Sequence, residues 1–133
     1  MKRTTQRKPL RAPETGPLIR AHMSVAGGLA LAVGRALKVR SRALQIFTKN
    51  ANQWKARPLR AEEARAFREA WEASGLAPPV AHDSYLINLA SPDPALRKKS
   101  IEALADEIRR CEALGVRYLV AHPGAHIGSG VRD

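Results

Sequence analysis

Two stretches decide the fold of this chain: PVAHDSYLINL at residues 79–89 and YLVAHPGAH at residues 118–126. In each, a short apolar run ends at a histidine, His82 or His122, and turn-forming residues follow. Short apolar runs bounded by turn residues are typical of buried strands. If the two strands are parallel, both imidazoles lie at the same end of the sheet, where α/β barrels assemble metal sites.

The rest of the chain alternates strands with helices. Helices are predicted at 29–39, 61–74 and 94–114, and strands at 18–22, 43–47, 80–82 and 116–121. This order indicates an α/β fold with a parallel sheet and right-handed crossovers. Four strands and three helices fit either an open sheet or the N-terminal half of a TIM (β/α)8 barrel, which typically needs about 250 residues.

Length and composition point to one domain with one core. With 133 residues, of which 5% are aromatic, the core should consist mostly of Ala, Leu and Val. Residues 1–17 are polar, basic and proline-containing, so we expect a disordered leader before an ordered domain at 18–133. The chain shows neither a secretory signal nor an apolar run long enough to span a membrane.

The helix over 94–114 has a predicted apolar stripe that includes Cys111, together with Ile101, Leu104 and Ile108. Cys111 is therefore interpreted as a packing residue and not as a nucleophile. It is the only cysteine, which excludes an internal disulfide and fits a reducing cytoplasm.

The net charge of +11 indicates a polyanionic partner, since Lys and Arg displace counterions from phosphates. A general solubility bias is the alternative. The excess is uneven, which favours nucleic acid. Residues 35–68 contain Glu62 and Glu63 against ten cations: Arg35, Lys38, Arg40, Arg42, Lys49, Lys55, Arg57, Arg60, Arg65 and Arg68.

Two further motifs, HMSVAGGL at 22–29 and FTKNANQW at 47–54, complete a pattern. With the two histidine stretches, they resemble endonuclease IV, the zinc-dependent apurinic/apyrimidinic endonucleases of base-excision repair. The resemblance covers about residues 18–128, and it extends over only the N-terminal half of the family's eight-stranded barrel. It implies hydrolysis of the phosphodiester 5′ to an abasic site in DNA by three zinc ions at the barrel mouth.

The resemblance also assigns roles. His82 and His122 match two ligands of one zinc ion, and Tyr85 matches a tyrosine that enters the DNA near the lesion. The loops that match DNA-gripping loops contain Gly27, Gly28, Lys49, Asn50 and Asn52. Asn52 departs from the family's pattern, because the family often has at this position an arginine that pushes into the base stack.

Three neighbouring residues have open roles. His22 ends the first predicted strand and is interpreted as a group supporting the metal ligands or facing DNA. Asp83 has two interpretations: it accepts a hydrogen bond from a metal-bound imidazole, or it caps the following turn. His126 lies beyond the second turn and receives no role.

The family's remaining ligands belong to four strands whose sequence is not in this chain. We therefore expect a truncated product or fragment, or one part of a split barrel with a C-terminal half-barrel polypeptide as partner. The 133 residues alone should not cleave DNA. Two alternatives remain: a non-catalytic DNA-binding half-barrel, and a member of the sugar isomerase/epimerase branch of the same superfamily. The basic segment 48–57 argues against the second.

Overall fold

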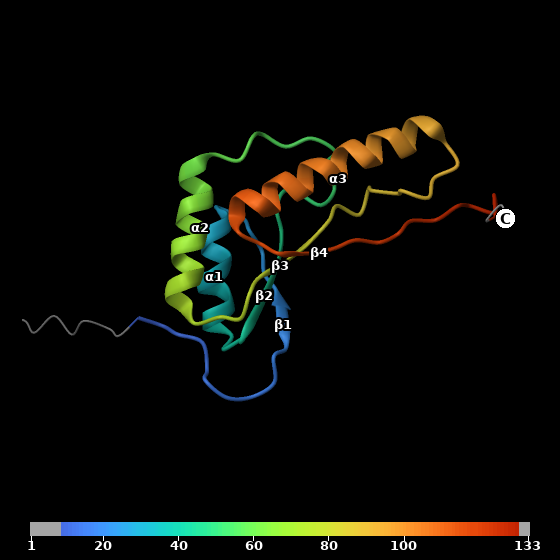
Figure 1. The fold of residues 1–133 in the computed structure, drawn as a ribbon. Coiled ribbons are helices and arrows are strands. Elements are labelled where there is room, and N and C mark those ends of the chain that lie inside the picture. The colour runs from blue at the N-terminus through green and yellow to red at the C-terminus, as the bar shows by residue number, and fades with distance from the viewer. Residues whose placement is uncertain (1–8, 131–133) are drawn as a thin grey trace, which may run out of the picture.

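The structure, a computed structural model, describes residues 9–130 and alternates strands with helices throughout (Figure 1). The elements are β1 (Arg20–His22), α1 (Leu29–Lys38), β2 (Ala43–Phe47), α2 (Ala61–Ser74), β3 (Val80–His82), α3 (Pro94–Leu114) and β4 (Tyr118–Val120). All neighbouring strands pair in parallel, in the order β1-β2-β3-β4. The predicted parallel α/β arrangement is therefore confirmed, and this sequential strand order is the one that the N-terminal half of a TIM barrel has.

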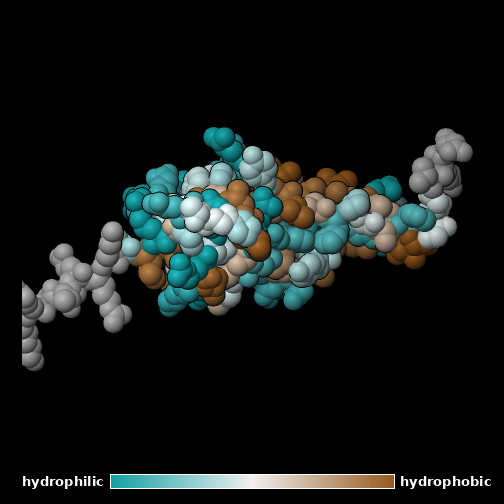
Figure 2. Space-filling view, turned by 90° about the horizontal axis from the view of Figure 1, so that it is seen from below, coloured by the Kyte–Doolittle hydropathy of each residue, from teal (hydrophilic) through white to brown (hydrophobic). Residues whose placement is uncertain are grey.

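The two outer strands are shorter than predicted. β1 begins at Arg20 instead of Leu18, and β4 comprises Tyr118–Val120 instead of 116–121. Among the described residues, β1 and β4 form the edges of the sheet and pair on one side only. Tyr118 of β4 and Ile19, which directly precedes β1, are more than half exposed. Apolar side chains reach the surface in several places in the space-filling view (Figure 2).

The helices begin and end where local chemistry satisfies their free backbone groups. Asp93 Oδ1 accepts hydrogen bonds from the backbone N–H groups of Ala95 (2.8 Å) and Leu96 (3.4 Å) at the start of α3. Gly75 and Gly115 adopt left-handed conformations after α2 and α3, as helix C-caps commonly do.

The core lies between the sheet and its helices. α2 packs against both α1 and α3, and Phe67 of α2 is fully buried against the sheet residues Leu44 and Ile46. Small residues such as Ala36 and Ala64 allow the helices to approach closely. This agrees with the predicted core of few aromatics.

The predicted stripe of α3 is wrong in part. Ile101 and Ile108 are 55% and 52% exposed, whereas Ser100 and Glu107 are buried along with Cys111. Polar side chains can occupy a buried helix face when hydrogen bonds compensate their lost hydration. Ser100 Oγ accepts from the backbone N–H of Asn88 at 3.0 Å, and Glu107 accepts from the Thr48 hydroxyl.

The described part of the predicted leader, residues 9–17, contains no helix or strand and packs beside the start of β2. The backbone N–H of Ala12 donates to Ser74 O at 2.8 Å, and Arg42 donates to Gly16 O. Residues 1–8 of that leader lie outside the described residues. Within residues 9–130 no helix combines the length and apolarity needed to cross a membrane.

Burial raises the pKa of Cys111 to about 11, with the charge of Glu107 adding to the effect. At pH 8 about one thiol in a thousand should then be ionised, and labelling by iodoacetamide requires the thiolate. We expect little labelling of native protein and rapid labelling in denaturant, measured by intact mass. Equal rates in the two conditions would contradict the burial of this thiol.

Candidate functional site

Even register offsets bring four ring side chains to one face of the sheet at the ends of its strands. Where β1 pairs with β2, His22 aligns with Gln45, which lies two residues before Phe47. Where β2 pairs with β3, Phe47 aligns with His82. Val120 of β4 aligns with His82, and His122 lies two residues after Val120. Because side chains alternate between faces with a period of two, these positions share the same face.

The rings form a contiguous cluster at the mouth formed by the carboxyl ends of the strands. The ring centroids of His82 and His122 are 5.1 Å apart, and those of His22 and His82 are 6.4 Å apart. Phe47 lies 4.4 Å from His22 and 5.5 Å from His82, and Tyr85 lies 5.3 Å from Phe47. The structure thus brings together the histidines that the sequence placed at three strand ends.

His82 is oriented by its neighbour in sequence. Its Nδ1 lies 2.8 Å from the backbone oxygen of Asp83, a hydrogen bond that requires a proton on Nδ1. In the neutral imidazole, Nε2 then carries the free lone pair, which is the usual arrangement of a metal-ligating histidine. His82 is buried, His122 is exposed, and His22 is exposed as well.

Asp83 is a buried acid beside these imidazoles. Its side chain is 1% exposed, and neither carboxylate oxygen has a hydrogen-bond partner among the described residues; Oδ1 lies 3.5 Å from His82 Nδ1. Burial raises the pKa of Asp83, while the charges of His82 and His122 act in the opposite direction. An unpaired buried carboxylate is costly, so this environment favours either the protonated form of Asp83 or a cation beside it.

His22 lies beside a polar side chain of β2, and its pKa is lowered. Its Nδ1 lies 3.4 Å from the amide nitrogen of Gln45. Partial burial of the ring, and then the proximity of His82, lower the pKa of His22. It is therefore neutral at neutral pH and able to donate or accept a hydrogen bond in the mouth.

The donor set fits part of a metal shell. Within residues 9–130, no group of three or more His, Cys, Asp or Glu side chains is placed to hold a metal ion. His82 and His122 supply two nitrogen donors, whereas a structural or catalytic zinc site uses three or four protein ligands.

A pair of hydrogen bonds joins the turn after His82 to the turn after His122. Asn88 Nδ2 donates to Ala125 O (3.0 Å), and the Ala125 backbone N–H donates to Asn88 Oδ1 (2.9 Å). Gly124 makes this approach possible, since a Cβ there would overlap Asn88 Oδ1 and its φ is +97°. The turn after His122 is thereby fixed to the turn after His82.

Four of the six residues predicted to contact DNA line a common cavity, and two lie outside it. Gly27, Gly28, Lys49 and Asn50 line one cavity of about 490 Å³ beside the mouth. Asn52 and Tyr85 lie outside it, and Tyr85 is 62% exposed at the rim. Their DNA contacts stay predictions.

Lys49 is buried, whereas Asn50 and Asn52 of the same loop are exposed. Its side chain is 2% exposed, and Nζ lies 3.1 Å from an Asp106 carboxylate oxygen. Its charge is therefore directed into the protein and not toward the surface. Exposed Asn50 and Asn52 form the tip of the loop, where Asn50 Oδ1 accepts from the backbone N–H of Asn52 at 2.9 Å.

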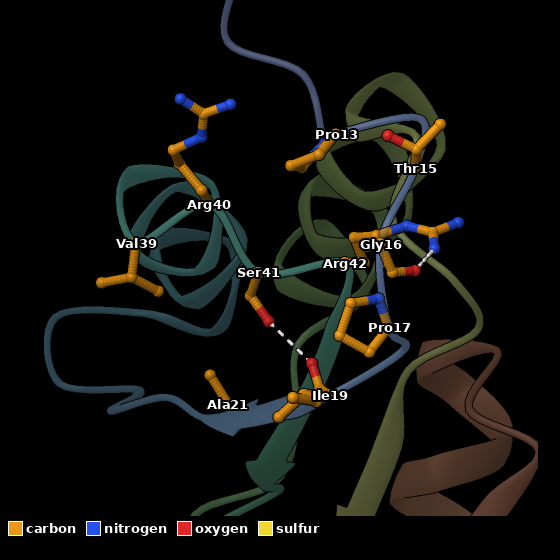
Figure 3. Close-up of a pocket in the computed structure, with 10 residues that line it drawn as sticks. All are labelled: Pro13, Thr15, Gly16, Pro17, Ile19, Ala21, Val39, Arg40, Ser41 and Arg42. Carbon is orange, nitrogen blue, oxygen red and sulfur yellow. Dashed lines mark hydrogen bonds between the residues drawn. The ribbon is translucent and has the colours of Figure 1, made fainter.

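A different cavity, of about 310 Å³, lies at the opposite end of the strands (Figure 3). Its walls come from residues 13–21 and 39–42. Ser41 Oγ donates there to Ile19 O at 3.2 Å, and Arg42 to Gly16 O. It contains none of the predicted site residues, which leaves the histidine mouth as the candidate site.

Sequence reasoning missed three groups at the mouth. Phe47 occupies the strand-end position of β2 that histidines occupy in its neighbours, and that equivalence was readable from the sequence. Asn88 and Glu107 carried no such signal, because each acts through a partner more than thirty residues away in the chain.

Comparisons with known proteins agree with this geometry. Residues 35–133 match the model of the xylose isomerase-like TIM barrel family. A probable endonuclease 4 of Chloroflexus aurantiacus is 52% identical over 114 residues, covering 86% of this chain and 40% of the relative. One of Geobacter sulfurreducens is 49% identical over 110 residues, covering 83% and 37%.

A solved structure is also similar. The crystal structure of endonuclease IV from Thermus thermophilus matches with a TM-score of 0.77 and 42% sequence identity. The match covers 83% of this chain and 41% of that one. This chain therefore spans about two fifths of the length of the relatives it matches.

Replacing Gly124 with Ala should separate the two histidine turns, because the new Cβ would collide with Asn88 Oδ1. Losing the paired hydrogen bonds should accelerate amide exchange at Ala125 on the order of tenfold. The matched control is Gly128→Ala, where φ is also positive (+79°) but a Cβ would meet nothing within 4 Å. Hydrogen–deuterium exchange measures both, and equal protection in the two variants would contradict the contact.

Proposed function

Because this chain belongs to the xylose isomerase-like TIM barrel family, and its curated relatives are named endonuclease 4, we propose that it supplies the DNA-facing N-terminal half of a zinc-dependent abasic-site endonuclease. The observation that carries the proposal is the placement of His82 and His122 with their rings 5.1 Å apart, beside exposed Tyr85. An imidazole pair, a buried acid and an exposed aromatic at one mouth suit a metal centre that faces a nucleic acid.

The metal would be held in part by His82 and His122, with Asp83 providing negative charge behind them. Zinc would activate water and neutralise the phosphate, as metal ions do in phosphodiester hydrolysis. This chain's own residues would hold the substrate. Tyr85 would stack at the lesion, where a missing base makes extrusion least costly, and the cavity beside Gly27 and Gly28 would receive the backbone.

The proposed site is incomplete in these residues, because two imidazoles leave half of a tetrahedral shell to other donors. We therefore propose that the complete site needs a C-terminal half-barrel, within one longer chain or as a second polypeptide. Without it, a DNA-binding role that requires no metal is the second candidate, favoured by the lack of a third donor among residues 9–130.

Duplex DNA should bind this chain weakly, with little preference for an abasic site. Phosphate contacts release counterions, so affinity should fall steeply between about 50 and 200 mM salt. Fluorescence anisotropy with a labelled duplex, with and without a chelator, measures this. Affinity that does not change with salt, or no binding at low salt, would contradict a DNA-facing surface.

Incision tests the catalytic part of the proposal. With zinc, the 133-residue chain alone should not cut a synthetic abasic duplex. Adding the C-terminal remainder of the Chloroflexus aurantiacus relative should give zinc-dependent incision once size-exclusion chromatography shows assembly. His82→Ala and His122→Ala should abolish the incision, whereas His126→Ala should retain it.

Either of two results would contradict this. Incision by the 133 residues alone, lost in both ligand variants, would show that fewer donors suffice. An assembled complex that turns over a ketose and leaves abasic DNA intact would favour the sugar isomerase branch.

A further inference from the structure

The segment after β2, residues 48–57, is attached to α3 at both of its ends. Arg110 Nε and Nη2 donate to Thr48 O at 3.2 and 2.8 Å, and Nη1 donates to Arg57 O at 3.1 Å. One guanidinium thus contacts the first and the last residue of the segment, which we call the β2 loop. Its fixed planar geometry suits such multiple contacts better than an ammonium would.

The acids one turn earlier on α3 complete the attachment. Lys49 Nζ lies 3.1 Å from Asp106 Oδ2 and 3.8 Å from Glu107 Oε1, and Glu107 also accepts from the Thr48 hydroxyl. We call Asp106, Glu107 and Arg110 the α3 clamp. Lys49 additionally lies 3.5 Å from Trp54 O, in the middle of the loop.

Two oppositely charged members of this cluster, Lys49 and Glu107, are buried. The side chains of Lys49 and Glu107 are 2% and 1% exposed. Lys49 faces both Glu107 and Asp106, and the Asp106 side chain is 43% exposed. Removing Lys49 would leave the buried Glu107 without its ion-pair partner, which is strongly unfavourable. The arrangement therefore holds one loop geometry instead of several.

The clamp contacts the backbone ends and the base of the loop while its tip stays accessible. Asn50 and Asn52 are exposed, and Lys55 extends from the outer part of the same segment. In the middle of the loop, Nζ of Lys99 of α3 lies 4.4 Å from the centroid of the Trp54 ring. Groups that are held in place before binding lose less conformational freedom when a ligand arrives.

We propose that Arg110, together with Asp106 and Glu107, is a positioning group that holds the β2 loop in its DNA-binding geometry. Lys49 belongs to this internal network, and the tip residues and Lys55 make the contacts with DNA. The inference rests on the proposed function in one respect: that the loop meets DNA.

The test compares Arg110→Ala with Arg109→Ala, since both remove one positive charge from adjacent positions on α3 and Arg109 is exposed. Arg110→Ala should accelerate amide exchange within residues 48–57 at least about tenfold and weaken binding to a labelled duplex about tenfold more than Arg109→Ala does. Arg110 lines the cavity beside Gly27 and Gly28, but its Nε, Nη1 and Nη2 already donate to loop carbonyl oxygens. The slope of log affinity against log salt should therefore be equal in the two variants.

Arg110→Lys keeps the charge but loses the planar fork, and it should give intermediate exchange and affinity. This variant maintains the test if Arg110→Ala does not fold, which thermal unfolding would show. A purely structural role would accelerate exchange across the whole sheet and not in the loop alone.

Three outcomes overturn the proposal separately. Unchanged loop exchange in Arg110→Ala and Arg110→Lys would disprove the clamp. Faster loop exchange with affinity equal to that of Arg109→Ala would disprove the positioning role. A salt slope lower by about one in Arg110→Ala than in Arg109→Ala would make Arg110 a phosphate contact. Wild-type protein that binds no duplex overturns the proposed function, and the exchange measurement still decides whether the clamp exists.

Discussion

Parallel pairing in an even register carries one ring from each strand end to the same face of the sheet. The pairing of Phe47 with His82 sets this arrangement, and the offsets of two residues toward β1 and β4 preserve it. A shift of one residue between any two strands would turn a histidine to the opposite face. The mouth therefore depends on backbone hydrogen bonds made below it, and not on contacts among the imidazoles.

Around this mouth, the loops are held by polar contacts of their own. Asn88 fixes the turn after His122, and Ser84 Oγ donates to Ala51 O at 2.5 Å, which links the turn after His82 to the β2 loop. Each contact joins a side chain to a backbone atom, so the backbone path of one loop determines that of the next. The three loops form a connected rim.

Periodicity and turn chemistry were sufficient to predict the elements and the strand-end histidines. The apolar runs before His82 and His122, the cap at Asp93 and the glycines after α2 and α3 are local signals, and the structure has all of them. The outer strands were predicted too long because a strand's extent depends on pairing partners, which the sequence does not show.

The buried face of α3 could not be predicted for a related reason. A hydrophobic pattern selects Ile101 and Ile108, yet the helix buries Glu107, whose partners Thr48 and Lys49 lie nearly sixty residues earlier. Hydropathy describes single residues, whereas the cost of burying an acid depends on what faces it. The same limit applied to Lys49, whose charge contributed to the basic count but points inward.

The attachment of the β2 loop to α3 affects how such loops can be exchanged between relatives. A loop transplanted alone would leave behind the helix positions that determine its shape, although those positions lie some fifty residues downstream. Recombination of homologous genes that divides the chain between β2 and α3 should therefore yield mismatched combinations. The β2 loop and the face of α3 that contacts it should therefore vary together among relatives, although they are distant in sequence.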